Sequence, residues 1–139
     1  MIKTALSAFA LAALTLPMAV SAQQDAADTV ASKGEAKLAK LIEGRVAGEP
    51  ESCIRDFPVR SFQVIDGTAI VYKIGRTVWV NRTRDPESLD DRDTLVFRRF
   101  GSQVCSTDIV TTIDPVGGFY TGNVFLSEFV PYRLPEKEG

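Results

Sequence analysis

Residues 61–81 read SFQVIDGTAIVYKIGRTVWVN. Val, Ile, Tyr, Thr and Trp dominate three short runs in it, at 61–65, 68–73 and 77–81, and such β-branched and aromatic residues favour strands. Asp66-Gly67 is a strong hairpin-turn signal between the first two runs, and Gly75-Arg76 interrupts the chain before the third. The stretch therefore predicts a β-meander of three antiparallel strands.

Short β-rich runs separated by turn residues continue toward the C-terminus. Further strands are expected at 93–99, 103–105, 108–114 and 123–132. The last run can divide into two strands, and the run at 108–114 is also compatible with a short helix. About six to seven short strands with turns every ~8–12 residues predict a mainly β fold, as a small antiparallel sandwich or a partly open barrel.

One short helix is expected before the β region. The stretch Ser32-Lys33-Gly34-Glu35 fits a capping box, in which the Ser hydroxyl caps a free amide and the Glu side chain reaches back. Three apolar residues after it share one helical face, namely Leu38, Leu41 and Ile42. Gly44 is well placed as the C-terminal stop. The sequence therefore predicts a helix over 33–43.

The first 22 residues resemble a secretory signal peptide. Lys3 precedes an apolar stretch at 5–20, and Val20-Ser21-Ala22 has the small-x-small pattern that signal peptidase requires, so cleavage is predicted after Ala22. The alternative, a membrane anchor, is disfavoured because the run is short and rich in weakly apolar Ala. The product should be periplasmic or secreted, with no membrane span after cleavage.

The remainder of the chain is organised as one domain with a leader. A flexible leader and the short helix are expected at 23–44, and a single β-rich domain with a polar C-terminal tail at 45–139. A domain of this size can bury about 65% of its unfolded surface. Folding as a single unit is therefore expected.

The chain contains two cysteines, Cys53 and Cys105. In an oxidising compartment they are expected to form one disulfide, which in the chain-entropy model stabilises the fold by up to ~4 kcal/mol. An exchange-active pair is the alternative, but redox enzymes usually hold their cysteines close together as C-x-x-C. A structural disulfide is therefore predicted.

Composition excludes several classes of function. The chain has 16 Lys and Arg against 18 Asp and Glu, so loss of Lys3 with the signal leaves a net charge of −3. That charge argues against a nucleic-acid partner, because sequence-independent binding needs a basic face. The chain has no histidine, which removes Ser-His-Asp and Cys-His catalysis and His-containing zinc sites. We assign no catalytic residue, metal ligand or cofactor, and the chain is more consistent with a non-enzyme.

The segment RTRDPESLDDRD at 82–93 gathers five acids among three arginines. It does not fit an EF-hand, because Leu89 stands where the third acid should be. A calcium site of another kind, built from Asp90, Asp91 and Asp93, stays open as an alternative. The favoured interpretation is a turn-forming loop at 85–93 whose opposite charges partly neutralise each other.

Two further alternatives concern ligands. A hydrolase acting on glycans would need two carboxylates across a cleft, and Asp66 and Asp108 are the acids considered for it. Trp79 could stack on a sugar but is more typical of a core residue. Phe119 and Tyr120 follow Gly117-Gly118, so they are expected on an exposed loop, where aromatic residues can anchor a partner.

Several motifs resemble a family of small exported proteobacterial proteins of unknown function. They are GRVAGEPESCI at 44–54, VIDGTAIVY at 64–72, VWVNR at 78–82, LDDRDTLV at 89–96, GSQVCSTDIV at 101–110 and FVPYR at 129–133. The resemblance implies an exported globular domain and brings no activity or ligand with it. The sequence therefore favours a non-enzymatic binding or structural module with one disulfide, whose partner would be an envelope protein.

Overall fold

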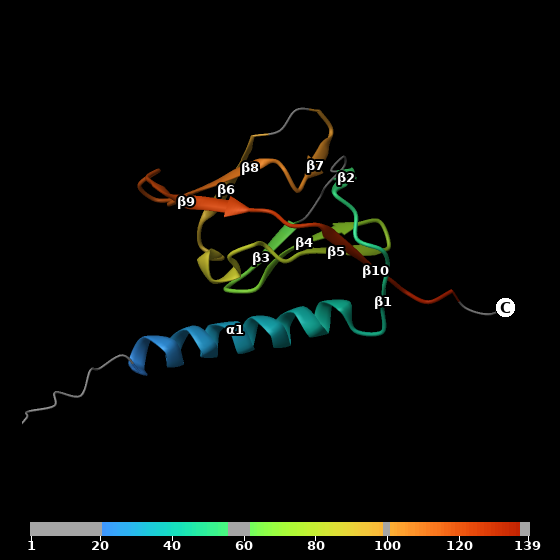
Figure 1. The fold of residues 1–139 in the computed structure, drawn as a ribbon, viewed down its shortest axis with the longest axis horizontal. Helices are drawn as coiled ribbons and strands as arrows, with labels where there is room; N and C mark the ends of the chain where they lie inside the picture. Colours follow the sequence, from blue (N-terminus) through green and yellow to red (C-terminus); the bar gives the residue numbers. More distant parts are fainter. Residues whose placement is uncertain (1–20, 56–61, 99–100, 137–139) are drawn as a thin grey trace, which may run out of the picture.

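The computed structural model describes residues 21–55, 62–98 and 101–136 (Figure 1). Most of the expected signal peptide lies outside this part, as do the last three residues of the tail. Two expected strands each have one end residue outside it, Ser61 and Arg99. The described residues form a helix, α1 (Ser21–Ile42), a 3₁₀ turn, η1 (Pro86–Ser88), and ten strands. The strands are β1 (Val46–Ala47), β2 (Cys53–Arg55), β3 (Phe62–Ile65), β4 (Ala69–Ile74), β5 (Thr77–Asn81), β6 (Thr94–Arg98), β7 (Gln103–Cys105), β8 (Ile109–Ile113), β9 (Tyr120–Phe125) and β10 (Phe129–Arg133).

The expected meander is confirmed as the centre of a five-stranded antiparallel sheet in the order β1-β10-β5-β4-β3. Ile65 pairs with Ala69 across the Asp66-Gly67 turn, where Gly67 has a φ of 59° that suits glycine. The C-terminal strand β10 fills the place between β1 and β5. Two smaller antiparallel sheets complete the fold, β2-β7 and β6-β8-β9.

The three sheets and the helix form layers. In Figure 1, α1 lies along one face of the five-stranded sheet and the two smaller sheets lie on the other. Strand β4 shows why, because its residues alternate between two cores: Ala69 and Val71 pack toward Leu38 of α1, while Ile70 and Tyr72 pack toward the smaller sheets. The fold is mainly β and sandwich-like, as predicted, and it is not a closed barrel.

The helix is longer than the sequence indicates. It begins at Ser21 instead of Lys33, so the residues expected as a flexible leader are helical. Ser32 is not an N-cap, because it lies inside the helix and its hydroxyl donates to the carbonyl of Thr29 at 2.9 Å. Glu35 does not complete a capping box; it forms an ion pair with Arg82. Within the described part of the chain, no helix is long and apolar enough to cross a membrane.

The remaining strand predictions hold with small shifts. The strand expected at 108–114 is present as β8 (Ile109–Ile113), which excludes the helical alternative there, and the expected 123–132 run divides into β9 and β10 around residues 126–128. Strands β1 and β2 were not predicted. Each has only two or three residues, too few to show a period, and each depends on a distant partner: β1 pairs with β10 and β2 with β7.

Candidate functional site

The three-stranded sheet has one face on the core and one face on solvent. Antiparallel pairing aligns its residues in rows across β6, β8 and β9. Alternate rows point inward, with Val110 and Val124 buried and Leu95 and Phe97 packed against the core. The other rows point outward: Thr94, Ile113 and Tyr120; then Val96, Thr111 and Asn123; then Arg98, Ile109 and Phe125.

This outward side is unusually apolar. Six large apolar side chains are exposed on it and on the adjoining β8–β9 hairpin, and we call them the apolar face: Val96 (38% exposed), Ile109 (60%), Val116 (95%), Phe119 (73%), Tyr120 (64%) and Phe125 (54%). Single exposed apolar residues are ordinary, but several large ones gathered on one side of a sheet favour an interaction site. The prediction that Phe119 and Tyr120 are exposed is confirmed, although Tyr120 is the first residue of β9 and not part of the loop. Their contact with a partner stays a prediction.

The hairpin tip that carries Phe119 is ordered by Asp114. Its carboxylate accepts hydrogen bonds from the amides of Val116 at 3.0 Å and Gly117 at 2.5 Å, and its own amide donates to the carbonyl of Phe119 at 2.8 Å. The Phe119 ring lies so close to Gly117 that a β-carbon there would overlap it. The backbone of the tip is therefore held by hydrogen bonds, so less backbone order must be gained there on contact.

A cavity of about 480 Å³ adjoins the other end of the apolar face. Ile109 and Phe125 belong to both, and Arg84, Thr107 and Asp108 extend the lining beyond the sheet. The Arg84 amide donates to the carbonyl of Phe125 at 2.9 Å, which fixes this segment beside β9. No described carboxylate lies within ion-pair distance of the Arg84 guanidinium.

The predicted disulfide between Cys53 and Cys105 is confirmed, with an S–S distance of 2.07 Å. The two cysteines are direct partners in the β2–β7 pair. The chain leaves Cys105 through a turn in which the Cys105 amide donates to Asp108 Oδ2 at 2.8 Å, and the Asp108 amide donates back to the Cys105 carbonyl at 3.0 Å. The disulfide thus anchors the turn that lines the cavity.

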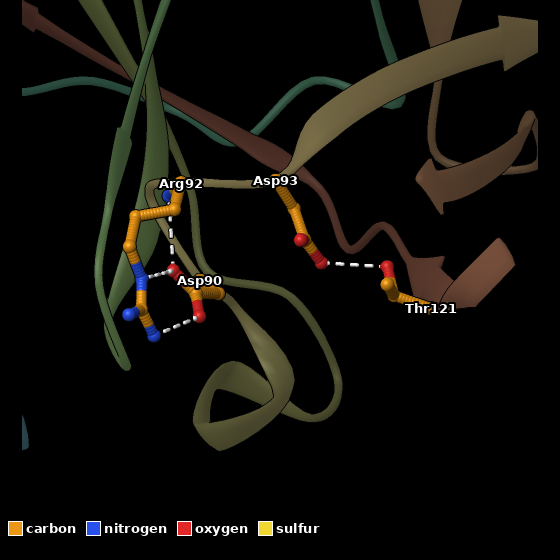
Figure 2. A network of polar contacts seen from close by, with 4 residues as sticks. All are labelled: Asp90, Arg92, Asp93 and Thr121. Atoms are coloured by element: carbon orange, nitrogen blue, oxygen red, sulfur yellow. Dashed lines mark hydrogen bonds and ion pairs between the residues drawn. The ribbon is translucent and has the colours of Figure 1, made fainter. Parts of the chain in front are cut away.

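The acidic segment forms a loop held by separate pairs (Figure 2). Asp90 accepts hydrogen bonds from the backbone amide, Nε and Nη2 of Arg92 at 2.9, 3.0 and 2.7 Å, and these bonds lower the pKa of Asp90. Asp93 instead accepts from the hydroxyl of Thr121 at 2.7 Å. Among the described residues, no group of three or more acids, cysteines or histidines is arranged to hold a metal ion. The geometry gives the calcium hypothesis no support.

The carboxylate pair considered for glycan hydrolysis does not assemble. Asp66 lines a cavity of about 440 Å³ between α1 and the η1 turn, whereas Asp108 lines the cavity beside the apolar face. Burial and then the charges of neighbouring Asp90 and Asp91 raise the pKa of Asp66. Asp90 shares that cavity, but its carboxylate is already held by Arg92. Trp79 packs against the core, with the Arg133 guanidinium 5.7 Å from its ring centroid.

Comparison of the chain with protein-family models, curated proteins and solved structures gives no match. The candidate site therefore depends on this structure alone. Sequence reasoning found Phe119 and Tyr120 but missed Val96, Ile109 and Phe125. Successive residues of a strand point to opposite sides of the sheet. Because both sides of these strands carry apolar residues, the sequence pattern could not show which side meets solvent.

Proposed function

We propose that the protein is a non-enzymatic binding module, stabilised by its disulfide, that associates with another protein molecule through the apolar face. The observation that carries the proposal is the convergence of six exposed apolar side chains on one side of the three-stranded sheet and its hairpin tip. Three of the six are aromatic, the residue class enriched at the energetic centres of protein interfaces. The hydrogen-bonded backbone of the tip supports binding further, because less backbone order must be gained on contact.

The proposal includes location outside the cytoplasm. The predicted signal peptide, with cleavage after Ala22, and the resemblance to small exported proteins both support export. The disulfide between Cys53 and Cys105 is of the kind that persists in oxidising compartments. The expected partner class is therefore a protein of the cell envelope, and the net negative charge disfavours nucleic acid and anionic lipid.

A binding role is preferred to catalysis because the two carboxylates that border the face, Asp108 and Asp114, already have structural partners. Asp114 orders the hairpin tip, and Asp108 orders the turn beside the cavity. Neither carboxylate is paired with a second acid or a nucleophile in the manner that hydrolysis requires. Apolar contact surface is what the face offers.

Photo-cross-linking from the face tests the proposal. Tyr120 is replaced by the photoreactive residue benzoylphenylalanine, and the matched control carries the same residue at Val46, an exposed position on β1 in the five-stranded sheet. Irradiation in living cells should give a discrete protein adduct from position 120 and none from position 46. Only diffuse adducts, or equal adducts from both positions, would refute binding through this face.

A further inference from the structure

We infer that the molecule bound by the apolar face is a second copy of this chain, in a twofold-symmetric dimer formed by packing the two outward sheet faces together. This inference rests on the proposed function and names its partner. Three observations carry it: the face has a projecting hairpin at one end and a cavity at the other, its exposed area approaches that of one side of a dimer interface, and its polar residues are compatible with self-pairing.

Shape is the first observation. The hairpin tip with Val116 and Phe119 projects beyond one end of the sheet. The cavity of about 480 Å³ lies at the other end, where Ile109, Asn123 and Phe125 contribute to its lining. In a twofold interface, a contact between one end of the face and the opposite end in the second copy occurs twice. The twofold axis is placed between the two sheets, parallel to them and perpendicular to the strands. Each tip then meets the cavity of the other copy, so both protrusions and both cavities are filled.

Register fixes which side chains would meet. With this axis each strand lies over its own copy running in the opposite direction, as in aligned sheet-on-sheet packing. Tyr120 at one end of β9 then faces Phe125 of the second copy, and Ile113 at one end of β8 faces Ile109. The central row lies near the axis, where Asn123 faces Asn123 of the second copy, and an amide pair can donate and accept reciprocally.

Area is the second observation. If a whole aromatic side chain contributes about 150–250 Å² and an aliphatic one somewhat less, the exposed fractions of the six residues give on the order of 600 Å² of apolar surface. This is at the upper end of what monomers leave exposed, about 300–600 Å². With the polar residues of the three rows, the face approaches the ~800 Å² per partner of a standard interface.

Charge is the third observation. Arg98 is the only residue in the three outward rows that is charged at neutral pH, and in the twofold arrangement it faces Thr94, so like charges are not forced together. Charged residues are generally depleted from the centres of interfaces. The face therefore suits an apolar partner of the same kind as itself.

Sedimentation analysis of the purified exported protein, with its disulfide intact, tests the inference. The wild-type protein should sediment with twice the monomer mass in the micromolar range. Ile109→Lys and Phe119→Asp, at opposite ends of the face, should each raise the dimer dissociation constant about tenfold or more. The matched control Val46→Lys, at an exposed apolar position on β1, should leave it unchanged. A wild-type monomer throughout, or a dimer insensitive to the two face variants, overturns the inference.

A pair of charge variants tests the orientation. Tyr120→Lys and Phe125→Glu should each weaken self-association, because each places two charges against aromatic rings. Mixing the two variants should restore dimers as heterodimers, since one interface edge then pairs Lys with Glu and the other keeps the native contact. Failure of the mixture to recover overturns the proposed pairing. A cross-link from position 120 to a different protein, with a monomer in sedimentation, overturns the self-association while leaving the binding function intact.

Discussion

Replacement of Gly34 by Ala tests how α1 docks on the sheet. Gly34 is buried in the helix interior against the β3–β4 turn. A β-carbon at this position would overlap the hydroxyl of Thr68 and the carbonyl of Asp66. An isolated helix would gain about 1 kcal/mol from Gly→Ala, so intrinsic propensity and packing predict opposite signs for this one substitution.

Packing should dominate. The carbonyl of Asp66 belongs to a tight turn and cannot yield as a side-chain tip can, so the helix must move away from the sheet. That movement weakens the packing of Leu38 against Ala69 and Val71 of β4. Leu38 is buried one turn further along the helix. Overpacking of this kind costs about 1–3 kcal/mol, and partial exposure of a buried leucine adds a fraction of its 1.5–3 kcal/mol burial energy. We expect a net loss of ~1–3 kcal/mol.

Urea unfolding followed by circular dichroism measures the change. Ala39→Gly, at an exposed helical position, serves as the reference because it isolates the propensity effect in this helix and should cost about 1 kcal/mol. In a background of Thr68→Ala, which removes the overlapping hydroxyl but keeps the Thr68 β-carbon and the Asp66 carbonyl, Gly34→Ala should cost less. A Gly34→Ala protein more stable than wild type would refute the close helix–sheet approach.

Three further predictions concern stability. Arg82→Met should cost about 0.5–1 kcal/mol of unfolding free energy at neutral pH, since the Arg82–Glu35 pair is exposed. Hydrogen bonding to Arg82 lowers the pKa of Glu35. The cost, measured by urea titration, should therefore disappear as the pH falls below the ordinary glutamate pKa of ~4.3. Asp66→Asn should raise the melting temperature at neutral pH, because burial and neighbouring carboxylates raise the pKa of Asp66; the gain should shrink on acidification, and a gain independent of pH would contradict this cause. Replacing Cys53 and Cys105 together by Ser should lower the unfolding free energy by ~3–4 kcal/mol, whereas unchanged stability would show that the disulfide is dispensable.

The β-meander was predictable because its determinants are local. Residues 61–81 contain their own turn signals, and the observed strand at 77–81 has the predicted limits. The helix start was not predictable in this way. Ser32 and Glu35 satisfy a local capping pattern, but Glu35 instead bonds to Arg82, with Nη2 and Oε2 2.9 Å apart. Such a contact joins residues far apart in the sequence, so a local pattern cannot reveal it.

The same distinction applies to the candidate site. The disulfide followed from the number of cysteines and the predicted compartment, and the exposure of Phe119 followed from the glycines before it. The apolar face did not follow, because β8 reads Ile-Val-Thr-Thr-Ile, which is equally suited to burial on either side. Only the pairing of Val110 and Val124 toward the main core determines that Ile109 and Phe125 point outward.

This two-sided apolar character is the strongest reason to expect a partner. The inner side of the three-stranded sheet is sufficient to hold it on the core, since Val110 and Val124 are buried there and Leu95 and Phe97 pack against them. The fold does not require the outer residues to be apolar, because threonine or charged residues satisfy the outer side of a half-buried antiparallel sheet equally well. Large apolar side chains that the fold does not need, placed beside an aromatic hairpin tip, are the basis on which we propose a contact with another protein surface.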